Sequence, residues 1–171
     1  MKSILASTVI ALAFVIGSVQ AAELDLGSLR MEWPDGYKEL GGDSPIQLVG
    51  PDGTGVLITV WKVSPEGDSS EAPNTRLAFS SIAESNLPKL AAAQGKVVVS
   101  LQQQSLPSGS VLYSTATKTG SRRTPEFYLQ YMLVAPSTRA ALFTIEGRGE
   151  AIAQHARFRE YFDSAAWLDA R

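Results

Sequence analysis

Residues 111–147 read VLYSTATKTGSRRTPEFYLQYMLVAPSTRAALFTIEG. Three stretches in this segment are rich in β-branched, aromatic and aliphatic side chains, with Gly or Pro between them; they cover residues 111–118, 127–134 and 140–145. Apolar runs bounded by turn residues are typical of β-strands. Because the connections are too short for a crossover, consecutive strands must pair antiparallel. The sequence therefore predicts a three-stranded meander here.

Four further strands are predicted on the N-terminal side of the meander. Residues 29–33 alternate between apolar and polar side chains, which places the apolar ones on a single face. Residues 46–49 and 56–63 are joined by the segment GPDGTG at residues 50–55, whose Gly and Pro residues favour a hairpin turn. Residues 96–103 begin with a run of valines after Lys and precede a Pro-Ser-Gly turn.

A long amphipathic helix is predicted from residue 73 or 74 to about residue 94. Apolar side chains recur there at helical spacing, at Phe79, Ile82, Ala83, Leu87, Leu90 and Ala91. We expect Ile82 and Leu90 to face the sheet through this stripe. Pro88 lies inside the pattern and is expected to kink the helix or to split it in two, because proline cannot donate the helical hydrogen bond.

A second helix, over about residues 149–162, has its apolar side chains in one stripe, formed by Ala151, His155, Phe158 and Phe162. Short turns between successive strands favour antiparallel pairing, and two amphipathic helices can cover a sheet. The predicted fold class is therefore α+β, with a mostly antiparallel sheet of about six or seven strands covered by two amphipathic helices.

Residues 1–21 have the pattern of a secretory signal peptide. A single lysine precedes a largely apolar run over residues 4–16, and a Val-Gln-Ala cleavage motif ends at Ala21. The run is too short to span a bilayer, which needs about 20 apolar residues. We expect cleavage after Ala21 or Ala22, which leaves residues 22–171 as one domain with no stable membrane span, in the periplasm or outside the cell.

Composition narrows the range of functions. The whole chain has 171 residues with 15 basic and 17 acidic side chains, and its formal net charge is −2. Only Lys2 lies in the expected signal peptide, so the mature chain carries a net charge of −3, which gives no electrostatic case for nucleic acid. There is no cysteine, and this excludes disulfides and thiolate chemistry.

Several stretches together resemble the PsbP/Mog family of α/β/α sandwiches, which includes DcrB-type envelope proteins. They are MEWPDGYKEL (31–40), QLVGPDGTGVLITVWKV (47–63), VVVSLQQQSLPSGSVLYSTATKT (97–119), EFYLQYMLVAPSTRAALFTIEG (126–147) and FREYFDSAAW (158–167). The likeness covers nearly all of the mature chain, although Tyr37 stands where Trp is commoner. It implies a PsbP-like sandwich and a binding or assembly module without a shared active site; some family members bind calcium or other metals. Because one fold serves many functions, the site must be argued separately.

His155 is the only histidine, and its place on an apolar stripe predicts a partly buried structural role. A general base would need a nucleophile and an orienting acid nearby, and no motif supplies them. The sequence contains no G-x-S-x-G, H-E-x-x-H or glycine-rich phosphate motif. We therefore predict no catalytic residue, no cofactor and no metal site.

The predicted partner-binding site is the basic hairpin tip formed by Lys118, Arg122 and Arg123. Arginine pairs readily with carboxylates, so we expect this tip to dock an acidic protein partner. A turn that serves only solubility is the alternative.

Glu66, Asp68 and Glu71 lie in a polar loop and could chelate calcium, but their spacing is not that of an EF-hand, and a solvated acidic loop is favoured. The three tryptophans are expected in the core or at its rim: Trp33, Trp61 and Trp167.

The function expected from the sequence is an exported, non-enzymatic binding or assembly module of the bacterial envelope that acts through contacts with a protein partner. One alternative is an immunity protein that neutralises a secreted toxin in the periplasm. An alternative from another class is a divergent periplasmic hydrolase. With one histidine and no cysteine, such a hydrolase would depend on carboxylates, and no carboxylate pair stands out. The sequence leaves the partner and the oligomeric state open.

Overall fold

The computed structural model describes residues 21–41, 45–62, 72–120 and 125–168. Its elements are β1 (Ala21–Asp25), β2 (Leu29–Pro34), β3 (Lys38–Gly41), β4 (Ile46–Val49), β5 (Gly55–Lys62), α1 (Ala72–Gln94), β6 (Lys96–Ser105), β7 (Val111–Lys118), β8 (Phe127–Val134), β9 (Arg139–Gly147), α2 (Ala151–Arg159), the 3-10 helix η2 (Glu160–Ser164) and β10 (Ala166–Trp167). Seven strands form an antiparallel sheet in the order β3-β4-β5-β9-β8-β7-β6. The predicted fold class, an antiparallel α+β sheet with two helices, is confirmed.

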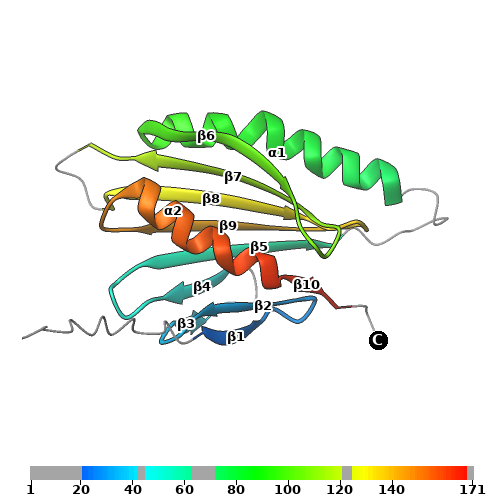
Figure 1. Ribbon diagram of the computed structural model, residues 1–171, viewed down its shortest axis with the longest axis horizontal. Helices are drawn as coiled ribbons and strands as arrows, with labels where there is room; N and C mark the ends of the chain where they lie inside the picture. The colour runs from blue at the N-terminus through cyan, green and yellow to red at the C-terminus, as the bar shows by residue number, and fades with distance from the viewer. Residues whose placement is uncertain (1–20, 42–44, 63–71, 121–124, 169–171) are drawn as a thin grey trace, which may run out of the picture.

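The layers lie on opposite faces of this main sheet. Helix α2 and a small sheet, with the strand order β1-β2-β10, cover one face, whereas α1 lies against the other face near β6 and β7 (Figure 1). The predicted meander is confirmed, and β7 and β8 begin and end at the predicted residues. The predicted turn between β4 and β5 is also present: the Gly50 amide donates to the Thr54 carbonyl at 2.8 Å, and Gly53 has a φ of 79°, which favours glycine.

The small sheet was only partly predicted. Strand β2 is the predicted strand at residues 29–33, but it pairs with β1 and β10 and not with the main sheet. Strands β1, β3 and β10 were not predicted. β1 has the sequence AAELD, which has low strand propensity, and β10 has only two residues, so neither stands out as a strand without its partner.

Trp33 joins the small sheet to the rest of the core. Its indole is 2% exposed and stacks on Phe143 of β9, with 5.8 Å between the ring centroids. It also packs against Phe158 of α2 at 5.6 Å and against Phe162 of η2 at 6.4 Å. Aromatic pairs contribute about 0.5–1.5 kcal/mol each beyond their area burial. One side chain of β2 therefore holds three elements together.

The C-terminal helix begins at an N-cap residue, Glu150, whose carboxylate accepts a hydrogen bond from the Ala153 amide at 2.8 Å. The predicted helix over residues 149–162 is α2 followed by the tighter η2. All four residues of its predicted apolar stripe are buried, as expected: Ala151, His155, Phe158 and Phe162.

Helix α1 decides one expectation in part and corrects another. Pro88 does not split it, because one helix runs through that position from Ala72 to Gln94, and a kink at Pro88 stays a prediction. Ile82 and Leu90 do not face the sheet: they are 45% and 42% exposed. Each precedes a buried alanine, and neighbouring helix positions point about 100° apart. The buried row recurs at every fourth residue instead, as Phe79, Ala83, Leu87 and Ala91.

This row generates a paired stability prediction. Leu87 is 2% exposed, so Leu87→Ala should lower the free energy of unfolding by about 2–5 kcal/mol through lost burial and a cavity. Ile82→Ala, on the exposed side of the same helix, should change it by less than about 1 kcal/mol. Urea unfolding followed by circular dichroism measures both. Equal losses in the two variants would contradict the observed face.

Candidate functional site

The described elements leave half of one face of the main sheet open. Helix α1 packs against β6, β7 and β8, and its buried cluster extends to Ala140 and Leu142 of β9. No described element covers the same face of β5, β4 and β3, or the end of β9 at Glu146. We call this surface the open strip. It is defined by outward side chains of these four strands, chiefly Lys38, Leu40, Gln47, Leu57, Trp61 and Glu146.

The strand register arranges the open strip in rows, because directly paired residues of antiparallel strands lie side by side on one face. Lys38 pairs with Val49, Val49 with Gly55, and Gly55 with Glu146. These four residues therefore form a row across the strip, with a cation at one end and an anion at the other. Within the described part of the chain, neither Lys38 nor Glu146 takes part in an ion pair.

Apolar side chains are exposed beside this charged row. Leu40 is 65% exposed, Leu57 is 40% exposed and Trp61 is 37% exposed. A hollow of about 330 Å³ lies among Leu40, Gln47, Leu57 and Glu146. Exposed apolar side chains that adjoin one another on a sheet face are typical of a surface that binds another molecule.

Glu146 reaches toward the middle of the strip because Gly55 has no side chain. A Cβ at Gly55 would lie 3.4 Å from the Glu146 Cγ, so the glycine leaves the space that this side chain uses. On its other side Glu146 neighbours Tyr128, whose pKa is raised by burial first and then by the charge of Glu146. The carboxylate is thus positioned to meet a cation from outside the described chain.

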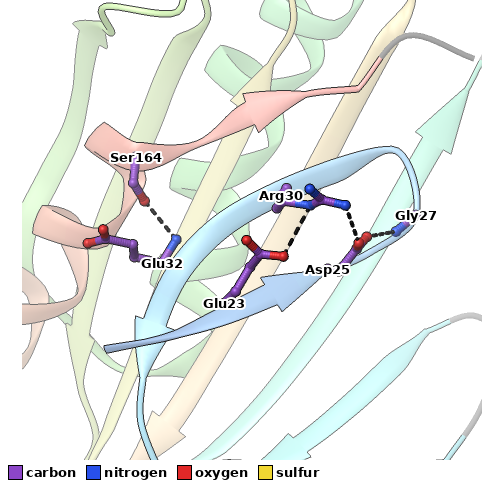
Figure 2. Close-up of polar contacts among 6 residues, drawn as sticks. All are labelled: Glu23, Asp25, Gly27, Arg30, Glu32 and Ser164. Carbon is purple, nitrogen blue, oxygen red and sulfur yellow. Dashed lines mark hydrogen bonds and ion pairs between the residues drawn. The ribbon is translucent and has the colours of Figure 1, made fainter. Parts of the chain in front are cut away.

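A second polar cluster lies on the outer face of the small sheet (Figure 2). Arg30 of β2 reaches two carboxylates of β1, Asp25 at 2.8 Å and Glu23 at 3.3 Å. Asp25 also accepts a hydrogen bond from the Gly27 amide at 2.8 Å. The Gly27 amide first, and Arg30 second, lower the pKa of Asp25. These groups are exposed, and the contacts position the hairpin of β1 and β2.

The same cluster ties the two ends of the described chain together. The Ser164 hydroxyl of η2 accepts a hydrogen bond from the Glu32 amide of β2 at 2.8 Å (Figure 2). Arg139 of β9 donates to the carbonyl of Leu168, just beyond β10. Acidic side chains here therefore have a structural explanation, and we place no ligand site on them.

The predicted partner-binding tip is only partly described. Lys118 is exposed at the end of β7, as a docking role requires. Arg122 and Arg123 lie outside the described residues, so the docking site at this tip stays a prediction. Glu66, Asp68 and Glu71 of the acidic loop also lie outside the described residues. Within the described ranges, no group of three or more His, Asp or Glu side chains could hold a metal ion.

His155 is buried in the structural role that the sequence predicts. Its ring stacks on Tyr131, with 5.3 Å between centroids and 12° between planes. The Tyr131 hydroxyl donates to the His155 carbonyl oxygen at 2.6 Å. The His155 Nε2 atom is buried and has no hydrogen-bond partner among the described residues. Burial first, and the nearby charge of Arg159 second, lower the pKa of His155.

The sequence analysis missed the open strip. Residues 56–61 read VLITVW, so both faces of β5 are apolar, which is typical of a strand buried on both faces. One face is buried through Val56 and Ile58, whereas Leu57 and Trp61 on the other face are exposed. The apolar residues on both faces of β5 were the sequence signal for this surface. Such a pattern does not show which of the two faces is left without a covering helix or sheet.

The two layers on opposite faces of an antiparallel sheet define a PsbP-like α+β sandwich. The solution structure of cyanobacterial PsbP (CyanoP) from Synechocystis sp. PCC 6803 is similar, with a TM-score of 0.52 and 11% sequence identity over 93% of this chain and 99% of that chain. A crystal structure from Bacteroides thetaiotaomicron VPI-5482 has a TM-score of 0.44 and 11% identity over 87% of this chain and 48% of that one. No protein-family model matches the sequence, and neither does any curated protein.

No described helix is both long and apolar enough to cross a membrane.

The buried histidine generates a pH prediction. The pKa of His155 lies below the ordinary histidine value of about 6.5, so the unfolded state binds more protons than the folded state below about pH 6.5. Stability should therefore fall as the pH drops below that value, by at most about 1.4 kcal/mol per pH unit. His155→Phe keeps a ring against Tyr131 and should flatten this part of the profile. Urea unfolding between pH 7.5 and pH 5 measures the free energy of unfolding of both proteins. If this free energy falls equally with pH in the wild type and in His155→Phe, protonation of His155 is not the cause.

Proposed function

We propose that this chain is an exported, non-enzymatic binding or assembly module of the bacterial envelope that acts through protein–protein contacts. The observation that carries the proposal is the open strip: Leu40, Leu57 and Trp61 expose apolar surface on a sheet whose other half is covered by a helix. Burying such a surface against a partner gains hydrophobic free energy, at about 25 cal/mol per Å² removed from water.

The strip also has the features that make binding selective. Lys38 and Glu146 stand at opposite ends of one row, so a partner must offer charges in a matching arrangement. The strip is formed by four paired strands, and a rigid surface loses little conformational entropy when it binds. A rigid, apolar surface with a defined charge pattern supports recognition of a protein.

The placement of the reactive side chains supports a binding role over a catalytic one. Burial is the main cause of the pKa shifts of His155 and Tyr131. The Tyr131 hydroxyl donates to the His155 carbonyl, and the His155 Nε2 atom is buried without a hydrogen-bond partner among the described residues. Shifted pKa values in a core reflect packing when no cleft gives a substrate access to them.

Export is supported by the N-terminal pattern. A lysine, an apolar run over residues 4–16 and a Val-Gln-Ala motif precede the first described strand. Ala21 is the first residue of β1 and is exposed. Cleavage after Ala21 would thus leave β1 with all but its first residue, so the mature chain keeps the small sheet.

Processing can be tested directly. We expect protein recovered from the cell envelope of an expressing bacterium to begin at Ala22, or at Glu23 if the second alanine is used. N-terminal sequencing and intact mass identify the terminus. Ala21→Arg should slow this cleavage, because signal peptidase requires small residues there. Protein that keeps Met1 in a washed membrane pellet would contradict release into the envelope.

The binding role can be tested with a photo-crosslinking residue in place of Leu57, on the open strip. The matched control places it at Ile152, which is exposed on α2 on the other side of the sheet. We expect protein adducts from Leu57 that are absent from Ile152, identified by mass spectrometry after irradiation of intact cells. Absence of any adduct specific to Leu57 would contradict a binding surface on the strip.

A further inference from the structure

We propose that the open strip of one molecule packs face to face on the open strip of a second copy of this chain. The inference rests on the proposed function and names a partner for the same surface. The two-fold axis runs parallel to the strands, between β4 and β5. Strands of the two copies then run in the same direction, as in aligned sheet packing, with the sheets about 10 Å apart.

Charge complementarity selects this arrangement. Lys38 on β3 and Glu146 on β9 lie in one row, and three strand spacings of about 4.8 Å place them roughly 14 Å apart. An axis between β4 and β5 lies midway between them. It therefore puts Lys38 of each copy opposite Glu146 of the other and forms two equivalent ion pairs. Neither group has an ion-pair partner within the described part of its own chain.

The apolar residues also match across this axis. Leu57 faces Gln47 of the other copy, because these two residues pair across β4 and β5. Val49 faces Gly55, where the methylene groups of Glu146 lie against the glycine. Leu40, the most exposed of the strip's leucines, faces the β9 strand of the other copy near Thr144. Leu57 and Leu40 thus each meet a neutral group of the other copy.

Helix α1 is compatible with this packing and adds to it. It lies over β6, β7 and β8, on the far side of β9 from the axis. Rotation about the axis therefore places α1 of each copy beyond β3 of the other, at the level of that sheet. Strand β3 is an edge strand of the main sheet. The helix would cover an edge that is otherwise open to unspecific pairing.

The size of the strip sets the strength that we expect. Three strand spacings make the strip roughly 14 Å wide, and its length falls from roughly 26 Å at the eight residues of β5 to roughly 13 Å at the four residues of β3 and of β4. A stable interface buries about 800 Å² on each partner, so this strip alone supports a weaker, concentration-dependent dimer.

The first experiment uses sedimentation equilibrium of the mature chain at concentrations up to about 1 mM. We expect a reversible equilibrium between monomer and dimer. Leu57→Glu puts a charge into the contact and should yield only monomer, whereas Ile152→Glu, the matched control on α2, should dimerise like the wild type. A monomeric wild type, or dimerisation of Leu57→Glu equal to that of the wild type, would overturn the proposal.

The second experiment tests the geometry with charge exchange. Lys38→Glu and Glu146→Lys each bring like charges together twice per dimer, so each should raise the dimer dissociation constant by about tenfold. An equimolar mixture of the two variants restores both ion pairs and should dimerise as a heterodimer with near wild-type affinity. Both substitutions are at exposed positions, so circular dichroism should show folded protein even if Leu57→Glu does not fold. A mixture that stays as monomeric as its components would overturn this arrangement.

The outcomes separate this inference from the proposed function. If the wild type stays monomeric but the crosslinker at Leu57 captures a different protein, self-pairing is wrong and the binding module stands. If the wild type stays monomeric and Leu57 captures nothing, both are wrong. Adducts between two copies of this chain, linked from Leu57 to β4 of the other copy, would support both.

Discussion

The packing of the Trp33 indole against rings from β9, α2 and η2 is the contact on which the architecture depends. Trp33 belongs to a small sheet that shares no hydrogen-bonded strand with the main sheet. Side-chain packing must therefore hold the two sheets together, and this one side chain reaches Phe143, Phe158 and Phe162. Two further contacts with β2 come from the C-terminal part of the described chain: the Ser164 hydroxyl accepts a hydrogen bond from the Glu32 amide, and β10 pairs with β2. The small sheet and α2 thus form a single cover over one face.

This arrangement makes the coverage of the main sheet unequal. One face receives the small sheet, α2 and η2, and its core extends from Leu48 on β4 to Ala116 on β7. Among the described elements the other face receives only α1, and the cluster buried under this helix reaches as far as Ala140 on β9. A single helix is about 10 Å wide and cannot cover seven strands spaced about 4.8 Å apart. The open strip is a geometric consequence of one helix on a wide sheet.

Polar groups inside the two cores are used for structure. Tyr131 donates to the backbone of α2, and Thr117 donates to the Ala91 carbonyl of α1 at 3.0 Å. These bonds satisfy buried hydroxyls and fix each helix along the sheet. The groups that stay available for recognition are at the surface, where Lys38 and Glu146 flank the exposed leucines of the strip. The proposed binding role is therefore placed on the surface that the described layers leave open.

The sequence by itself determined the elements whose signals are local. Apolar runs bounded by turn residues specified β7 and β8 at residues 111–118 and 127–134, and the turn residues at 50–55 specified a hairpin. Both signals depend only on neighbours along the chain. The tertiary structure alone decided where each covering layer ends, and therefore which apolar side chains stay exposed. Ile82 is apolar and lies in a helical pattern, yet it is exposed, and Leu57 lies in an apolar strand and is also exposed. Whether such a side chain is buried depends on whether a layer from a distant part of the sequence extends over it. The residue pattern within either segment carries no information about the extent of that layer.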